Sequence, residues 1–84
     1  MHVEFFGIPR ERAGVSELEV DARTLGELLD ALAARFPELR QLITRDGLDS
    51  SVTANLNGDL FVRDRTTLLA ENDHVLLLSA DAGG

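Results

Sequence analysis

One stretch in the middle of the chain has the repeat of an amphipathic helix. Thr24 and Glu27 have the spacing of a capping box, in which a threonine cap is followed three residues later by glutamate. Leucines then recur at helical spacing as far as Phe36. Pro37 ends the pattern, because proline removes a hydrogen-bond donor and clashes with the preceding turn. The sequence therefore predicts one main helix that begins after Thr24 and ends before Pro37.

The segments on either side of this helix have the patterns of β-strands. Residues 2–6 and 15–21 alternate between apolar and polar side chains, which predicts a hairpin with one buried face. Residues 52–56 and 60–62 are predicted strands joined by a tight turn at Asn57-Gly58, since both turn residues tolerate positive φ. The apolar run at 75–78 does not alternate, which indicates a central strand covered on both faces.

The remaining segments are predicted to connect these elements. Gly7, Pro9 and Gly14 bracket an expected loop, and residues 39–43 suggest one more helical turn or two. The simplest packing of these elements is a single helix across a four- or five-stranded mixed sheet. The first and last strands are expected to lie side by side in the middle of that sheet. This is an α+β fold of the β-grasp, or ubiquitin-like, type. A ferredoxin-like sandwich is the rival, but it needs a second full helix, and residues 38–45 are too short for one.

Length and charge narrow the functional classes. With 84 residues the chain is expected to form a single domain over 1–84, without room for a cleft between domains. It has no cysteine, which excludes thiolate metal sites, and with only His2 and His74 no metal site is expected. The net charge of −7 argues against nucleic acid and anionic membranes as partners. Without an apolar span or a signal peptide, the expected location is cytoplasmic.

The polar residues do not form a recognisable catalytic motif, so the chain is not expected to be an enzyme. His74, among polar residues, fits a solvated turn before a strand. Asp49-Ser50 is similar to the phosphopantetheine serine of acyl carrier proteins, which are also small and acidic. Those proteins are helix bundles, however, and Ser51 stands where they usually have an apolar residue. An ordinary turn is the favoured interpretation.

The last two residues of the sequence, Gly83 and Gly84, favour a function for that end of the chain. The alternative is a poorly ordered tail without a function, because termini are often poorly ordered. Residues without side chains suit a tail that threads a narrow tunnel and brings its carboxylate to a reactive centre in another protein. We therefore predict Gly84 as the attachment point, Gly83 and Ala82 as threading residues, and a flexible tail over 79–84.

Both ends of the chain resemble the MoaD/ThiS family of sulfur carrier proteins. The segment Phe5-Phe6-Gly7 through Gly14, with Arg10-Glu11 within it, resembles the opening of the small subunit of molybdopterin synthase (MoaD). Asp73-His74-Val75, a strand and the final diglycine resemble the end of MoaD and of the thiamine sulfur carrier ThiS. The resemblance spans nearly the whole chain.

This resemblance implies a carrier whose terminal glycine is adenylated by a ubiquitin-activating-type enzyme and converted to a thiocarboxylate. The ATP belongs to the activating enzyme, so no stably bound cofactor is expected. The thiocarboxylate then delivers sulfur to an acceptor enzyme such as the large subunit of molybdopterin synthase. Ser79 and Ala80 stand where MoaD usually has two prolines, which leaves thiamine, cysteine or another metabolite open as the destination of the sulfur. A ubiquitin-like protein modifier is the runner-up function, and a plain interaction domain is the third.

Strand alternation also predicts where partners dock. If Val3, Phe5, Val75 and Leu77 face the helix, their neighbours in the two central strands point to the uncovered face. The residues expected to form an apolar docking patch there are Phe6, Leu60, Leu76 and Leu78. The resemblance implies the same role, because the corresponding positions of MoaD lie against its synthase partner. The residues expected in the core are Val3, Phe5, Leu18, Val20, Leu28, Leu29, Leu32, Phe36, Leu56, Val75 and Leu77.

Overall fold

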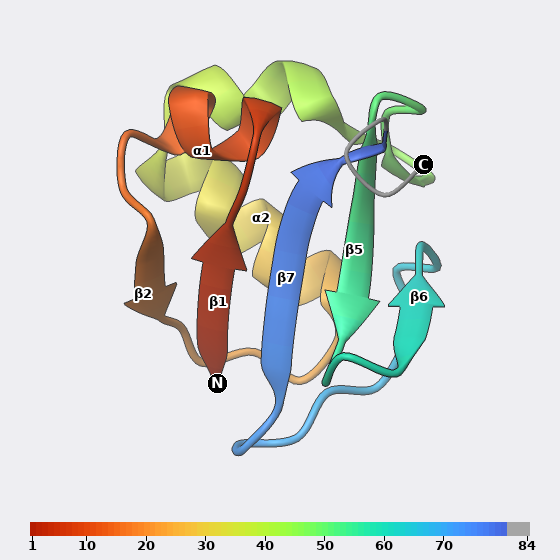
Figure 1. Ribbon diagram of the computed structural model, residues 1–84. Coiled ribbons are helices and arrows are strands. Elements are labelled where there is room, and N and C mark those ends of the chain that lie inside the picture. Colours follow the sequence, from red (N-terminus) through yellow and green to blue (C-terminus); the bar gives the residue numbers. More distant parts are fainter. Residues whose placement is uncertain (81–84) are drawn as a thin grey trace.

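A computed structural model describes residues 1–80 of the chain. Five strands form one mixed sheet in the order β2-β1-β7-β5-β6 (Figure 1). The two central strands, β1 and β7, are parallel, and every other neighbouring pair is antiparallel. The strand bounds are β1 His2–Phe5, β2 Glu17–Glu19, β5 Val52–Leu56, β6 Leu60–Val62 and β7 His74–Ser79. The β-grasp prediction is confirmed, with the first and last strands adjacent in the middle.

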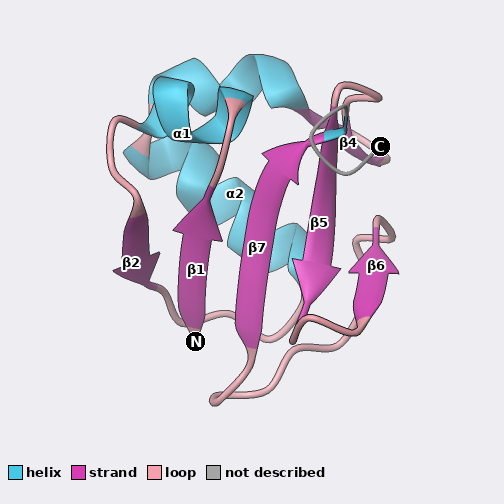
Figure 2. Ribbon diagram, in the orientation of Figure 1, coloured by secondary structure: helices cyan, strands magenta, loops and turns pink. Residues whose placement is uncertain are grey.

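Helix α2, Leu25–Arg35, crosses one face of the sheet (Figures 1 and 2). Its start is the predicted one, because the Thr24 hydroxyl accepts from the Glu27 backbone N–H at 3.1 Å. Leu28, Leu29 and Leu32 have no exposed surface and pack against the strands. The opposite face of the sheet carries no helix in the described part of the chain (Figure 2), and it is called the open face below.

The segment expected to be a loop after β1 is instead a short helix, α1, Ile8–Ala13. Pro9 lies in its first turn, where a missing N–H costs nothing, and Gly14 ends it in the left-handed conformation with φ 77°. Pro9 and Gly14, which are expected from the sequence to bracket a loop, are therefore helix boundaries. A 3-10 helix η1, Pro37–Leu42, supplies the extra turn expected after α2. The residues described therefore hold three helical segments, of which α2 is the main one.

Two hairpins complete the fold. The Asn57-Gly58 turn between β5 and β6 has φ values of 57° and 75°, as predicted for this dipeptide. A small pair of strands, β3 Ile43–Thr44 and β4 Gly47–Leu48, lies apart from the main sheet.

The core lies between the sheet and the helices. The predicted residues of β1, α2 and β7 are buried, whereas Leu18, Val20, Phe36 and Leu56 are partly buried and pack against them. No helix in residues 1–80 is long and apolar enough to cross a membrane.

Candidate functional site

The base of the C-terminal tail is held firmly against the rest of the domain. Ser79 is the last residue of β7 and is buried, and its hydroxyl accepts from the Ile8 N–H at 2.7 Å. The Ala80 N–H donates to the Ser51 carbonyl at 2.8 Å. Residues 79 and 80, which are predicted from the sequence to belong to a flexible tail, are thus hydrogen-bonded in the structure. The other expected tail residues, Asp81, Ala82, Gly83 and Gly84, lie outside the described residues.

Gly7 is required by this packing. Its φ is 61°, and a Cβ atom at this position would lie 2.2 Å from the Ser79 hydroxyl oxygen. The Ser79 side chain therefore fills the space beside Gly7 and at the same time supplies a hydrogen-bond acceptor for the first turn of α1. This contact joins the end of β1 to the end of β7, so it fixes where the tail leaves the domain.

The Ser79 hydrogen bond should make a measurable contribution to stability. We expect Ser79→Ala to lower the free energy of unfolding by about 1–2 kcal/mol, because it leaves the Ile8 N–H without its partner. Ser50→Ala is the matched control, since Ser50 is exposed and should change stability by less than about 0.5 kcal/mol. Urea unfolding of both variants checks this. Equal stabilities for the two would contradict the anchoring role of Ser79.

Apolar side chains of the two central strands reach the open face near the same end of the sheet. Leu76 and Leu78 alternate with the buried Val75 and Leu77 and are half-buried. Phe6 follows β1 with 43% of its surface exposed. The N–H of Phe6 still donates to the Leu77 carbonyl at 2.8 Å, so the chain has not yet left the sheet.

The prediction that Leu60 extends this patch is wrong about the face. Leu60 pairs with Leu56, which in turn pairs with the buried Val75, so Leu60 lies on the side of the sheet that carries α2. Its neighbour Phe61 pairs with Asn55, which pairs with Leu76, so Phe61 lies on the open face and is 62% exposed. The open-face patch therefore comprises Phe6, Leu76, Leu78 and Phe61.

A polar atom without a partner lies within this surface. Asn55 is 8% exposed, and its Oδ1 is enclosed without a hydrogen-bond partner among the described residues. The register places Asn55 between Leu76 and Phe61. Buried polar atoms are usually paired, so this acceptor marks a position where an incoming donor would be stabilising.

Charged and titratable groups gather at the other end of the open face, where β1 and β7 begin. His2 pairs with His74 across the parallel strands, and their rings meet edge to face at 4.9 Å. The His2 pKa is raised above its ordinary value, chiefly by the hydrogen bond to Glu19 and then by the negative charges of Glu17, Glu19 and Glu4. This cluster cannot be recognised in the sequence, because only the strand register brings two histidines from opposite ends of the chain together.

The Asp49-Ser50 pair lies in a turn before β5. The Asp49 carboxylate accepts from the Ser51 N–H at 3.0 Å and from the Ser51 hydroxyl at 2.5 Å. These bonds hold the pKa of the Asp49 carboxyl below its usual range. The side chain is thus occupied in fixing a local turn, which agrees with the turn interpretation of the sequence.

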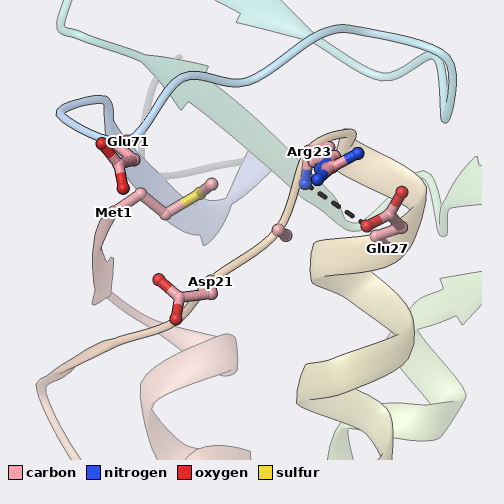
Figure 3. A pocket seen from close by; sticks show the side chains of 6 residues that line it. Met1, Asp21, Arg23, Glu27 and Glu71 are labelled. Atoms are coloured by element: carbon pink, nitrogen blue, oxygen red, sulfur yellow. Dashed lines mark hydrogen bonds between the residues drawn. The ribbon is translucent and has the colours of Figure 1, made fainter.

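A pocket of about 270 Å³ lies where the chain enters α2 (Figure 3). Its lining residues are Met1, Asp21, Ala22, Arg23, Glu27 and Glu71. The Glu27 carboxylate accepts from the Arg23 backbone N–H at 3.4 Å, so this residue also belongs to the helix cap. The pocket contains neither the base of the tail nor the open-face patch.

Solved structures with the same fold include a small archaeal modifier protein and two CysO proteins. The small archaeal modifier protein 1 (SAMP1) of Methanosarcina acetivorans is 28% identical, with a TM-score of 0.82, covering 99% of this chain and 94% of that one. CysO of Mycobacterium tuberculosis is 25% identical, with a TM-score of 0.77 and coverage of 94% and 97%. The BexX/CysO complex of Amycolatopsis orientalis matches in fold with a TM-score of 0.80 at 24% identity, covering 99% of this chain and 98% of that one.

Comparison with curated protein sequences gives no significant match. The model of the ThiS family, in contrast, matches residues 3–84, which is almost the whole sequence and includes the final diglycine. The resemblance to sulfur carriers that the two ends of the sequence suggest is thereby confirmed. The chain belongs to the ThiS family.

Proposed function

We propose that this protein is a sulfur carrier whose Gly84 carboxylate is converted to a thiocarboxylate. The observation that supports this most strongly is the match to the ThiS family through Gly83 and Gly84. The anchored tail base agrees with it, because a fixed exit point beside the open face lets a docked partner find the tail at a constant position.

The proposed chemistry takes place in two stages on the tail. A carboxylate oxygen of Gly84 attacks the α-phosphate of ATP, pyrophosphate leaves, and an acyl-adenylate forms. The terminal sulfur of a persulfide donor then attacks the acyl carbon and AMP leaves. A thiol reduces the S–S bond of the resulting acyl disulfide and is itself oxidised, which leaves –COSH on Gly84.

The catalytic groups for these steps are assigned to partner enzymes. The carrier supplies a carboxylate and a docking surface, so we assign it no enzymatic activity of its own and no stably bound cofactor. The ATP is bound and consumed by a ubiquitin-activating-type adenylating enzyme, and the natural setting is the cytoplasm, where ATP is available.

The open-face patch is the proposed docking surface for that enzyme and, in turn, for the acceptor enzyme. Leu78 directly precedes the anchored residues 79 and 80, so a partner seated on the patch also lies at the start of the tail. Apolar patches rimmed by charge commonly mark protein interfaces. The net charge of −7 favours basic partner surfaces and faster encounter at low salt.

Two adjacent residues of β6 test this surface. Phe61→Asp should weaken binding to the activating enzyme by at least about 10-fold, because it places a carboxylate within an apolar interface. Leu60→Asp is the matched control: it is similarly exposed, at 57%, but lies on the other face, and it should leave the dissociation constant unchanged. Calorimetric titration measures both variants, and an equal effect of the two would contradict docking through the open face. Phe6→Asp and Leu78→Asp should behave like Phe61→Asp.

Molybdopterin synthesis is the pathway we favour, because the segment from Phe5 to Gly14 resembles MoaD and the acceptor would then be the large subunit of molybdopterin synthase. Sulfur supply for thiamine or another metabolite is the alternative, since Ser79 and Ala80 replace the usual prolines. The second candidate function is that of a protein modifier, which the 28% identity to SAMP1 supports. Because the chain has no lysine, such a modifier would not build isopeptide chains on itself.

The exchange of labelled pyrophosphate into ATP tests the proposal at its first step. We expect exchange catalysed by the activating enzyme to depend on this protein, because the reverse of adenylation regenerates ATP from the acyl-adenylate. Exchange that is the same with and without the protein would contradict the proposed function.

A further inference from the structure

The two histidines of the chain and a carboxylate meet on the open face. His2 and Glu4 lie on β1 and point to the same side, and His74 begins β7 beside His2. One ligand atom from each of these three residues lies within 4.8 Å of the others. All three side chains are partly exposed, so the cluster is open to solvent on one side.

The spacing of these atoms suits a small metal ion. Glu4 Oε1 lies 3.8 Å from His2 Nε2 and 2.7 Å from His74 Nε2. Ligands at the usual distances of about 2.0–2.2 Å around a tetrahedral zinc ion are roughly 3.4 Å apart. Small side-chain rotations therefore suffice to place the three atoms around one ion.

Glu19 holds the His2 ring in the orientation that a metal ligand needs. His2 Nδ1 lies 2.7 Å from Glu19 Oε1, and since a carboxylate accepts, Nδ1 is the protonated nitrogen in the neutral ring. Nε2 then carries the lone pair, and it lies 3.8 Å from Glu4 Oε1 and 3.7 Å from Glu17 Oε1. An outer carboxylate that fixes the tautomer is the usual support of a metal-binding histidine.

His74 Nε2 gives a second indication. This nitrogen is enclosed and has no hydrogen-bond partner among residues 1–80. Glu4 Oε1 is at contact distance but without the alignment of a hydrogen bond. If His74 and Glu4 formed only an ion pair, the N–H of His74 would be expected to point at the Glu4 oxygen. An imidazole nitrogen that binds a metal ion needs no such alignment.

We propose that His2, Glu4 and His74 form a binding site for a divalent transition-metal ion of the zinc type. Two imidazole nitrogens and one carboxylate oxygen select zinc and its neighbours over magnesium and calcium, which prefer all-oxygen sites. The open side leaves room for a water molecule as a further ligand. This site departs from the expectation of no metal from the sequence, and it does not depend on the proposed sulfur-carrier function.

Proton NMR of the full chain during titration with Zn²⁺ tests the site. Since the chain has only two histidines, their ring signals can be followed individually. We expect both rings to shift and the shifts to saturate at one equivalent of Zn²⁺, whereas the same concentration of Mg²⁺ leaves them unchanged. A shift of one ring only, of neither ring, or an equal response to Mg²⁺ would overturn the proposal.

Calorimetric titration of variants with Zn²⁺ locates the ligands. We expect each of three variants to bind Zn²⁺ more weakly: His2→Gln, His74→Gln and Glu4→Gln. The loss in affinity should be at least the roughly 10–100-fold that is typical when a residue hydrogen-bonded to a metal ligand is removed. Glu11→Gln, an exposed carboxylate change on α1, is the control and should leave the affinity unchanged. Unaltered affinity in all three ligand variants would overturn the site. If a variant does not fold, the NMR titration of the wild-type histidine rings with Zn²⁺ still tests the site.

Discussion

Deletion of Gly84 should abolish adenylation of this protein. The proposed reaction uses the carboxylate of Gly84, and without this residue the acyl group would end one residue short of the ATP α-phosphate in the activating enzyme. We expect pyrophosphate exchange to fall to the level of the enzyme alone. The fold should be unchanged, because the last core residue is Leu77 and the last strand, β7, ends at Ser79.

Substitutions of Gly83 with side chains of increasing size complement this deletion. Gly83→Ala adds one methyl group and should retain part of the exchange activity, whereas Gly83→Phe should block it because the bulky side chain does not thread a narrow tunnel. Circular dichroism and calorimetric binding serve as controls, since docking through the open face should survive in every tail variant. Full exchange activity without Gly84 would contradict the assignment of the acyl group to this residue.

Truncation of the buried leucines of α2 should have the largest effect on stability. Leu29 and Leu32 have no exposed surface, so Leu29→Ala or Leu32→Ala removes buried methyl groups and leaves a cavity. We expect each to lower the free energy of unfolding by about 2–5 kcal/mol. This is a large share of the stability of a domain of this size.

Ala31 provides the matched control on the same helix, because it is exposed. Ala31→Gln should change the free energy of unfolding by less than about 0.5 kcal/mol, since glutamine is a good helix former and faces solvent. Urea unfolding followed by circular dichroism measures all three variants. Similar stabilities for Leu29→Ala and Ala31→Gln would show that α2 packs on the sheet through a different face.

The main elements of the fold follow from local patterns that can be recognised in the sequence. The start of α2 depends on Thr24 and Glu27, which are three residues apart, and the Asn57-Gly58 turn depends on two neighbouring residues. Helix α1 could not be predicted in the same way, because its six residues are too few to show a helical repeat. Its stability depends on contacts with distant segments, such as the hydrogen bond from Ile8 to Ser79.

The open face shows where local patterns cease to be sufficient. Residues 75–78 are all apolar, but the two-residue period of a strand correctly separates Leu76 and Leu78 from the core. In β6 both Leu60 and Phe61 are apolar and exposed, so alternation does not say which of them faces outward. Only the pairing of Phe61 with Asn55 decides it, and a shift of one residue in register would exchange the two faces.

The mass of the C-terminal peptide tests the central claim most directly. We would isolate the protein from its native cell under conditions that preserve thioacids and measure this peptide by mass spectrometry. A sulfur carrier is expected to show a fraction in which one oxygen of Gly84 is replaced by sulfur. Gly84 joined to lysines of other proteins, without any thiocarboxylate, would contradict the carrier function and favour a modifier. A tail with an unmodified carboxylate throughout would contradict both.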